Sequence, residues 1–152
     1  MVRVAQVQPY VRLAQVYDEL VVDPVYDRWA THLRDLWSAA DPPVGRVLDV
    51  CCGTGLLAEQ LVARGYEVVG VDSSAEMLDR ARGLLGDGVT LLRQSLPDLV
   101  VDGPFDAAVS TFDGLNYLTP DELRLTLVAV ARTLRPRGWV CLLYTSPSPR
   151  DS

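Results

Sequence analysis

The sequence predicts an α/β fold in which helices cover both faces of a doubly wound, mostly parallel sheet. Short apolar runs of strand length alternate with amphipathic helical segments, and short loops connect them. The run at residues 46–50 is too apolar for a strand with one exposed face, which is typical of a parallel strand covered on both sides. With 152 residues, 49% of them hydrophobic, the chain is long enough for one domain with its own core.

Local signals place each element in turn. Two helices are expected between Tyr10 and Ala40, since apolar residues recur there at three- and four-residue spacing and Asp23-Pro24 interrupts the pattern. Strands are expected at 46–50, 67–72, 89–93 and 105–110, with a fifth beginning at Trp139 after a turn at 135–138. Helices are expected at 56–64, from the cap at Ser73 to Leu84, and from the cap at Thr119 to Leu134. Residues 2–8 carry no clear signal.

Capping signals support three of these helix ends. Ser73-x-x-Glu76 and Thr119-x-x-Glu122 both have the spacing of a capping box, and a proline follows Thr119 at the first helical position. Gly65 is expected to end the first of the three helices in a left-handed conformation.

Two carboxylates stand near the ends of neighbouring predicted strands. Asp49 lies near the end of the first strand, the small-residue turn 51–55 follows, and Asp72 ends the second strand. Carboxyl ends of parallel strands meet at one edge of the sheet, where open α/β sheets bind ligands. An acid beside a glycine turn and a second acid about twenty residues later predict a nucleoside-binding site.

The turn leaves two kinds of nucleoside open. Gly53-x-Gly55-x-x-Ala58 formally matches the dinucleotide pattern, but Asp49 would repel a diphosphate by about 4 kcal/mol at ~4 Å and an effective dielectric near 20. S-adenosylmethionine carries no phosphate, and its ammonium and sulfonium groups favour a nearby acid. Asp72 would then accept hydrogen bonds from two ribose hydroxyls, each worth roughly 1.5–3 kcal/mol.

Four stretches, VLDVCCGTG, RGYEVVGVDSSAEMLDRAR, FDAAVS and LRPRG, resemble the class I S-adenosylmethionine-dependent methyltransferases, most closely the generic small-molecule methyltransferase domain. The resemblance runs from about Tyr10 to Val140. It implies a Rossmann-like sheet of seven strands, of which this chain supplies four and the start of a fifth. We therefore expect a domain truncated at about the fifth strand, preceded by N-terminal helices and left with an open apolar sheet edge.

The resemblance also implies a set of cofactor-binding residues. Cys51 replaces the first turn glycine of the family and would be strained if its φ were positive. The family's usual acid after the third strand is missing, so Ser95 or the backbone near Leu96 is expected to contact the adenine amine. Met77 is expected on the adenine, and Tyr17 over the cofactor. The full predicted set is Tyr17, Asp49, Cys51, Gly53, Gly55, Asp72, Ser73, Met77, Ser95 and Leu96.

The acceptor side carries weaker signals. Asp113, Asn116 and Tyr117 follow the fourth strand, where methyltransferases often face the acceptor, and Asp113 and Tyr117 are candidates for a general base. No residue is assigned that role. Three N-terminal residues are expected to be structural: Tyr26 and Trp29 in the core rather than in a substrate box, and His32 on the surface or in packing.

The composition limits the kinds of molecule that the protein is expected to bind. The net charge of −6 argues against nucleic acid and anionic membranes, and no transmembrane or signal segment is recognised. Three cysteines do not form a disulfide framework, and with His32 the only histidine no metal site is expected. We therefore expect a cytoplasmic protein that uses S-adenosylmethionine and a small-molecule acceptor.

Three segments follow from these observations. Residues 1–43 are interpreted as an N-terminal helical lid, and residues 44–140 as a partial cofactor-binding domain. Residues 141–151 can be back-translated into DNA that resembles a tagmentation sequencing adapter, so residues 141–152 are expected to be a non-native tail. A native Pro/Ser-rich tail is the alternative there. For the whole chain, the alternatives are an NAD(P)-dependent oxidoreductase domain and an inactive fragment.

Overall fold

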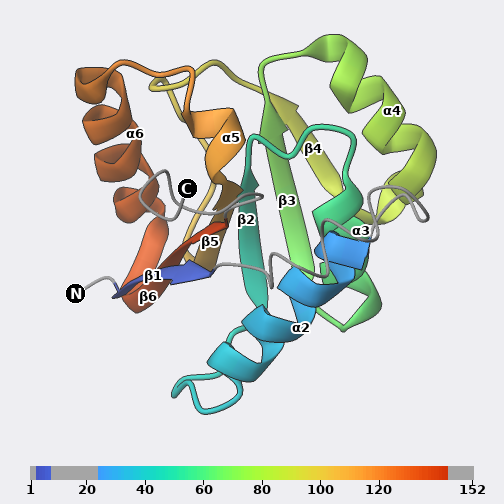
Figure 1. The fold of residues 1–152 in the computed structure, drawn as a ribbon, viewed down its shortest axis with the longest axis vertical. Coiled ribbons are helices and arrows are strands. Elements are labelled where there is room, and N and C mark those ends of the chain that lie inside the picture. The colour runs from blue at the N-terminus through green and yellow to red at the C-terminus, as the bar shows by residue number, and fades with distance from the viewer. Residues whose placement is uncertain (1–2, 8–23, 144–152) are drawn as a thin grey trace, which may run out of the picture.

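The computed structural model describes residues 3–7 and 24–143, which form a six-stranded parallel sheet in the order β1-β6-β5-β2-β3-β4, with helices on both faces (Figure 1). The strands are β1 (Arg3–Val7), β2 (Arg46–Val50), β3 (Glu67–Asp72), β4 (Thr90–Arg93), β5 (Phe105–Thr111) and β6 (Leu134–Leu143). The helices are α2 (Pro24–Trp37), α3 (Leu56–Ala63), α4 (Ala75–Leu85), α5 (Phe112–Leu115) and α6 (Pro120–Thr133). The predicted doubly wound α/β fold is confirmed.

Alternation along the central strand divides the core into two layers. Val47 packs in a cluster with α2 and α3, whereas Leu48 and Val50 pack in a second cluster with α5 and α6. Because side chains of a strand alternate between its two faces, Asp49 points to the same face as Val47, toward α2 and α3. The period of the strand therefore decides which helices can surround this carboxylate.

Helix α2 lies against α3 through one apolar stripe. Trp29, Leu33 and Trp37 recur at helical spacing and are nearly inaccessible to solvent, which confirms the prediction that Trp29 is a core residue. An ion pair of 2.6 Å between Arg64 and Asp27 ties the beginning of α2 to the end of α3. His32 is exposed, as expected of a surface residue. Within the described residues, none of the helices combines the length and apolar character needed to cross a bilayer.

One predicted capping box is confirmed and the other is wrong by one residue. Thr119 and Glu122 cap α6 reciprocally, with both hydrogen bonds present. At α4 the N-cap is Ser74 rather than Ser73, and its hydroxyl accepts from the Met77 N–H at 3.1 Å. The helix begins one residue later than predicted. The Asp72 carboxylate accepts from the Ser74 N–H, and this bond keeps Ser73 outside the helix.

The far edge of the sheet differs from expectation. Strand β6 begins at Leu134 and includes residues 135–138, which were predicted as a turn; Arg137 adopts a φ of 65°, and the pairing with β5 shifts in register between Phe105 and Ala107. The free side of β6 was expected to be an open edge, but β1 pairs with it in parallel over five residues.

The sequence analysis assigned no strand to β1. Residues 141–143, which belong to the segment interpreted as a non-native tail, complete β6, with Cys141 and Leu143 buried. The predicted first helix and Tyr17 lie outside the described residues.

Candidate functional site

A tight turn connects β2 to α3 at the carboxyl edge of the sheet. Cys51, Gly53 and Gly55 all have positive φ, at 63°, 56° and 88°. The Cys52 N–H donates to the Val71 carbonyl at 2.9 Å, so the turn stays attached to β3. The strain that the sequence predicted for Cys51 is therefore present, since this conformation costs a residue with a Cβ roughly 1–2 kcal/mol.

We expect Cys51→Gly to increase the free energy of unfolding by about 1 kcal/mol, because glycine adopts a φ of 63° without the Cβ clash. Urea denaturation measures this. Cys51→Ala is the control, as it removes the thiol but keeps the Cβ and should not gain stability. A Cys51→Gly protein less stable than Cys51→Ala would contradict the assignment of strain to this residue.

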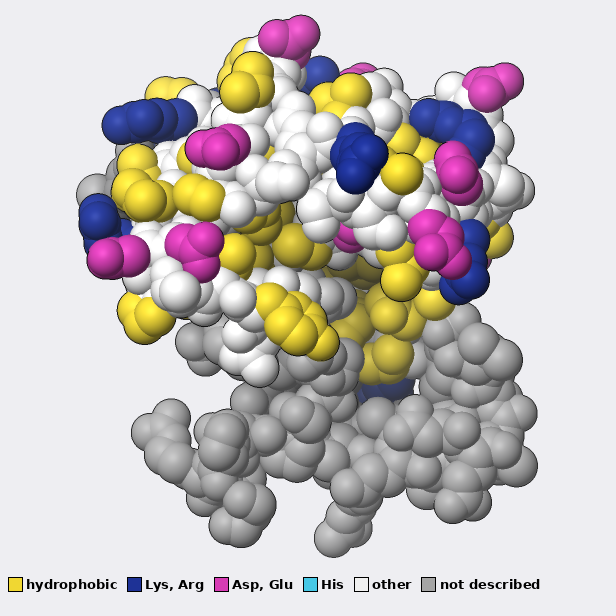
Figure 2. All heavy atoms as spheres, turned by 90° about the horizontal axis from the view of Figure 1, so that it is seen from above, with side chains coloured by type: hydrophobic (Ala, Val, Ile, Leu, Met, Phe, Trp, Pro, Cys, Tyr) yellow, Lys and Arg dark blue, Asp and Glu magenta, His cyan; other side chains and the backbone are white. Residues whose placement is uncertain are grey.

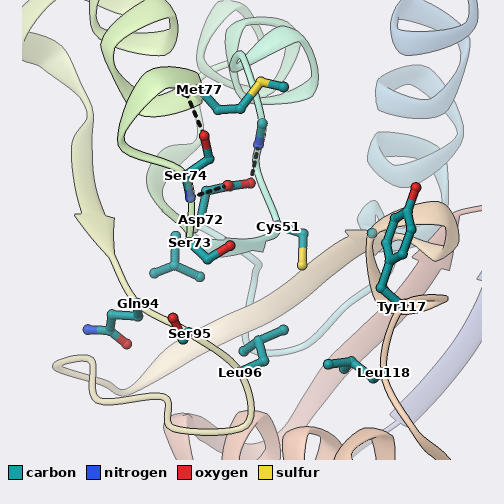
Figure 3. A pocket seen from close by; sticks show the side chains of 13 residues that line it. Cys51, Asp72, Ser73, Ser74, Met77, Gln94, Ser95, Leu96, Tyr117 and Leu118 are labelled. Atoms are coloured by element: carbon teal, nitrogen blue, oxygen red, sulfur yellow. Dashed lines mark hydrogen bonds between the residues drawn. The ribbon is translucent and has the colours of Figure 1, made fainter.

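Asp72 holds the turn and the next helix together. One carboxylate oxygen accepts from the Gly53 N–H and the other from the Ser74 N–H, both at 2.9 Å (Figure 3). Each oxygen can accept a further hydrogen bond, because a carboxylate oxygen offers about two acceptor sites. Asp72 thus fixes the shape of the site and still presents acceptors to a ligand.

Asp49 is a buried acid without a full set of partners. It is only 2% exposed, and its Oδ2 atom has no hydrogen-bond partner among the described residues. Burial, and then the negative charge of Asp72, raise the pKa of Asp49 to about 8. A buried polar atom left unpaired costs free energy, and a cation bound beside it would recover part of that cost.

A cavity of about 560 Å³ opens at this edge of the sheet. Gln94 and Ser95 lie on one side of it, and Tyr117 and Leu118 on the opposite side (Figure 3). Seen from above, the surface is hollowed here and apolar side chains gather in the hollow (Figure 2). The structure brings to this cavity the following predicted residues: Cys51, Gly53, Asp72, Ser73, Met77, Ser95, Leu96 and Tyr117.

A smaller cavity of about 120 Å³ lies on the α2 side of the turn. Asp49 lines this cavity and not the larger one, while Cys51 and Gly53 line both. The remaining lining residues are Tyr26, Cys52, Thr54, Leu56, Leu57 and Thr111. Asp72 therefore lines the larger cavity and Asp49 the smaller one, and the glycine turn forms a wall of both.

Gly55 lines neither cavity. A Cβ on Gly55 would lie 2.9 Å from Leu85 Cδ1 and 3.3 Å from Ala81 Cβ, so its small size lets α4 approach the turn. Asp113 falls in α5, but its side chain lies outside the described part of the structure. Tyr117 lines the larger cavity and is 92% exposed, whereas Asn116 is exposed and lines neither cavity.

Sequence reasoning missed several lining residues. Gly114 and Leu118 come from α5 and the loop after it, a segment without a strong helical pattern. A Cβ on Gly114 would lie 2.7 Å from the Cys51 Cβ, which shows how closely α5 approaches the turn. Tyr26 was assigned to the core by its spacing with Trp29. Tyr26 does pack against the core, as predicted, and it also lines the smaller cavity, which its spacing with Trp29 could not show.

The thiols beside the site are poor nucleophiles. Burial, followed by the charges of Asp72 and Asp49, raises the pKa of Cys51 to about 11, and the pKa of Cys52 is raised further. Both thiols stay protonated at neutral pH, and a protonated thiol is a weak nucleophile. Their contribution to the site is therefore one of shape.

Comparison with known proteins identifies the family. A family model described as a methyltransferase domain matches residues 47–138. The chain is 38% identical over 133 residues to the putative methyltransferase YqeM of Bacillus subtilis (strain 168), covering 85% of this chain and 52% of the relative. It is 34% identical over 116 residues to dTDP-3-amino-3,4,6-trideoxy-alpha-D-glucopyranose N,N-dimethyltransferase of Streptomyces venezuelae, covering 76% of this chain and 48% of that protein.

Solved structures agree with this result. S-adenosylmethionine-bound CalS10, an amino pentose methyltransferase from Micromonospora echinaspora, superposes with a TM-score of 0.74 at 29% identity, over 88% of this chain and 56% of that one. Streptomyces venezuelae DesVI gives a TM-score of 0.72 at 32% identity, over 88% and 58%. The chain spans about half the length of the curated relatives it matches. By the family model and by these relatives, the chain belongs to the methyltransferase domain family that its glycine turn and two acids led us to expect.

Proposed function

We propose that the chain forms the cofactor-binding part of an S-adenosylmethionine-dependent methyltransferase that acts on a small molecule. The observation that carries the proposal is the buried Oδ2 atom of Asp49 beside the glycine turn, which no described residue hydrogen-bonds. A carboxyl group that ionises here when a cation binds suits a ligand with a positive charge and disfavours a diphosphate. Relatives with solved structures that are described as bound to S-adenosylmethionine support the choice of ligand.

In this proposal the adenosine end of the cofactor occupies the larger cavity. Asp72 accepts from the ribose hydroxyls, and Met77 and Leu96 supply apolar surface for the adenine. The amide of Gln94 is already used, since its Oε1 accepts from the Val100 N–H at 2.8 Å and its Nε2 donates to the Val100 carbonyl. Ser95 therefore remains the better candidate for the adenine edge.

The amino-acid end of the cofactor then occupies the smaller cavity. Its ammonium group pairs with Asp49, and its carboxylate faces the N-terminus of α3, where Leu56 and Leu57 line the same cavity. Gly55 provides no side-chain cap at this helix end, so the first N–H groups are available to an anion. A zwitterion thus meets a negative group on one side and a partial positive charge on the other.

The acceptor is proposed to approach from the side of Gly114, Tyr117 and Leu118. S-adenosylmethionine supplies a methyl group that is already activated by the sulfonium. The residues around it have to align the acceptor and exclude water, and alignment alone can contribute roughly 7–11 kcal/mol. A general base is needed only where the acceptor must lose a proton, and Asp113 and Tyr117 remain the candidates for it. Relatives named as sugar methyltransferases favour a small-molecule acceptor.

Equilibrium binding tests the proposal directly. We expect isothermal titration calorimetry to detect S-adenosylhomocysteine, the product form of the cofactor, and to detect no binding of NAD under the same conditions. This experiment needs no acceptor and no turnover. Binding of NAD in preference to S-adenosylhomocysteine would favour the oxidoreductase alternative instead. We also propose a cytoplasmic location, supported by the free thiols of Cys51, Cys52 and Cys141.

A further inference from the structure

We propose that Tyr26 is a cofactor-binding residue whose aromatic ring covers the ammonium group held by Asp49. The inference rests on the proposed function and adds a residue to it. Tyr26 is half-buried and lines the smaller cavity from α2, whereas Asp49 lines it from β2.

The position of Tyr26 on its helix explains how it reaches the cavity. It belongs to the same stripe as Trp29 and Leu33, which are fully buried against the sheet and α3. Tyr26 lies one turn closer to the beginning of α2, where the packed core gives way to the cavity. Tyr26 therefore follows the spacing of the core residues and also lines the cavity.

The ring is also held in place. It makes an edge-on contact with Trp29, with centroids 5.3 Å apart and an interplanar angle of 82°. Asp27, the next residue, pairs with Arg64 at 2.6 Å, and Arg64 also donates to the Thr31 hydroxyl at 3.1 Å. These contacts fix the first turns of α2 against α3, so the ring needs little ordering when a ligand binds.

The surroundings select a cation. Asp49 carries the only carboxyl group among the nine described residues that line the cavity, and no Lys, Arg or His is among them. The described lining residues thus offer no positive charge to neutralise Asp49, which leaves that role to a cationic ligand. An aromatic ring attracts a cation over its face, and it does so more strongly where water is excluded. Asp49 and Tyr26 then form two walls of one ammonium site.

A pair of ligands separates this role from a general effect on folding. S-adenosylhomocysteine carries the amino-acid end, whereas 5′-methylthioadenosine has the same adenosine and thioether but lacks the ammonium and carboxylate. We expect Tyr26→Leu to weaken S-adenosylhomocysteine binding roughly three- to tenfold in calorimetry. Its affinity for 5′-methylthioadenosine should stay within about twofold of the wild-type value, because that ligand does not enter the smaller cavity.

Two variants serve as controls. Tyr26→Phe keeps the ring and should bind S-adenosylhomocysteine within about twofold of wild type. Tyr66→Leu removes a half-buried tyrosine from the same apolar cluster, where it makes a matching edge-on contact with Trp37 at 5.3 Å and 80°, but Tyr66 lines neither cavity. It should leave the affinities for both ligands unchanged.

Three results would overturn the inference alone: normal S-adenosylhomocysteine binding by Tyr26→Leu, equal weakening of both ligands, or a loss in Tyr26→Phe as large as in Tyr26→Leu. Failure of the wild-type chain to bind S-adenosylhomocysteine, with binding of NAD in its place, would overturn the proposed function and this inference together.

Discussion

Replacing Asp72 by alanine is expected to weaken binding of S-adenosylhomocysteine at least roughly tenfold, the worth of one charge-assisted hydrogen bond. The loss should be larger if both ribose hydroxyls bind the carboxylate. The variant also leaves the Gly53 and Ser74 N–H groups without their acceptor, so the turn and the start of α4 lose a common anchor. We also expect a lower free energy of unfolding, which urea denaturation without ligand would measure separately.

A ligand change distinguishes lost recognition from a distorted turn. Wild-type protein should prefer S-adenosylhomocysteine over its 2′-deoxy analogue, whereas Asp72→Ala should bind the two with similar affinity. Asp79→Ala is a charge-matched control, because Asp79 is an exposed residue of α4 that does not line the cavity. The ribose role would be refuted if Asp72→Ala kept the wild-type preference for the 2′-hydroxyl.

Asp49→Asn is expected to have opposite effects on ligand binding and on stability. The amide has no charge to offer the ammonium group, so S-adenosylhomocysteine should bind at least roughly tenfold more weakly. Affinity for 5′-methylthioadenosine should change little. Without ligand, the variant should be more stable than wild type near pH 8, because it removes an ionisable group that is 2% exposed and partly unpaired. A variant that is destabilised at pH 8 would contradict this account.

The raised pKa of Asp49 predicts how stability and affinity change with pH. Its folded-state pKa of about 8 lies above the ordinary value near 4, so folding favours the protonated form. That stabilisation is complete below about pH 4 and is lost as the pH rises through 8. Wild-type stability relative to Asp49→Asn should therefore fall by up to about 1.4 kcal/mol per pH unit between these values.

Ligand affinity should change in the opposite direction. Between pH 6 and 7.5 the ligand's ammonium is still mostly protonated, and S-adenosylhomocysteine should bind up to tenfold more tightly per pH unit as Asp49 ionises more readily. Calorimetry in buffers with different ionisation enthalpies would report the proton released. An affinity that does not depend on pH in this range, or a slope that persists in Asp49→Asn, would rule out Asp49 as the partner of the ammonium.

Local signals were sufficient for the part of the fold that carries the two acids. The bounds of β2 and β3 agree with those predicted from residues 46–50 and 67–72, because each strand is a short, mostly apolar stretch with a turn after it. The cap at Thr119 is likewise a short-range pattern. The pairing of β1 with β6 is different, since it joins residues more than a hundred positions apart and leaves no local mark in Arg3–Val7.

The site was predictable to the extent that it depends on strand ends. Asp49 and Asp72 were predicted because parallel strands bring their carboxyl ends together, whereas Ser73, Met77 and Ser95 were expected only from the family resemblance. All of these except Asp49 line the larger cavity. The division into two cavities was not foreseen, since it depends on which face of β2 carries Asp49 and on how far the core extends along α2. The placement of Gly114 depends on close packing against Cys51, which spacing along the chain does not reveal.

The parallel ladder between β1 and β6 has a consequence for synthesis on the ribosome. Strand β1 leaves the exit tunnel first, yet its partner is the last described strand to be made. Until then its backbone N–H and C=O groups have no ladder to join, and closing so long a loop carries an entropic cost that local contacts cannot offset. We therefore expect this ladder to form last, and its amide protons to exchange with deuterium before those of β2 and β5 at the centre of the sheet.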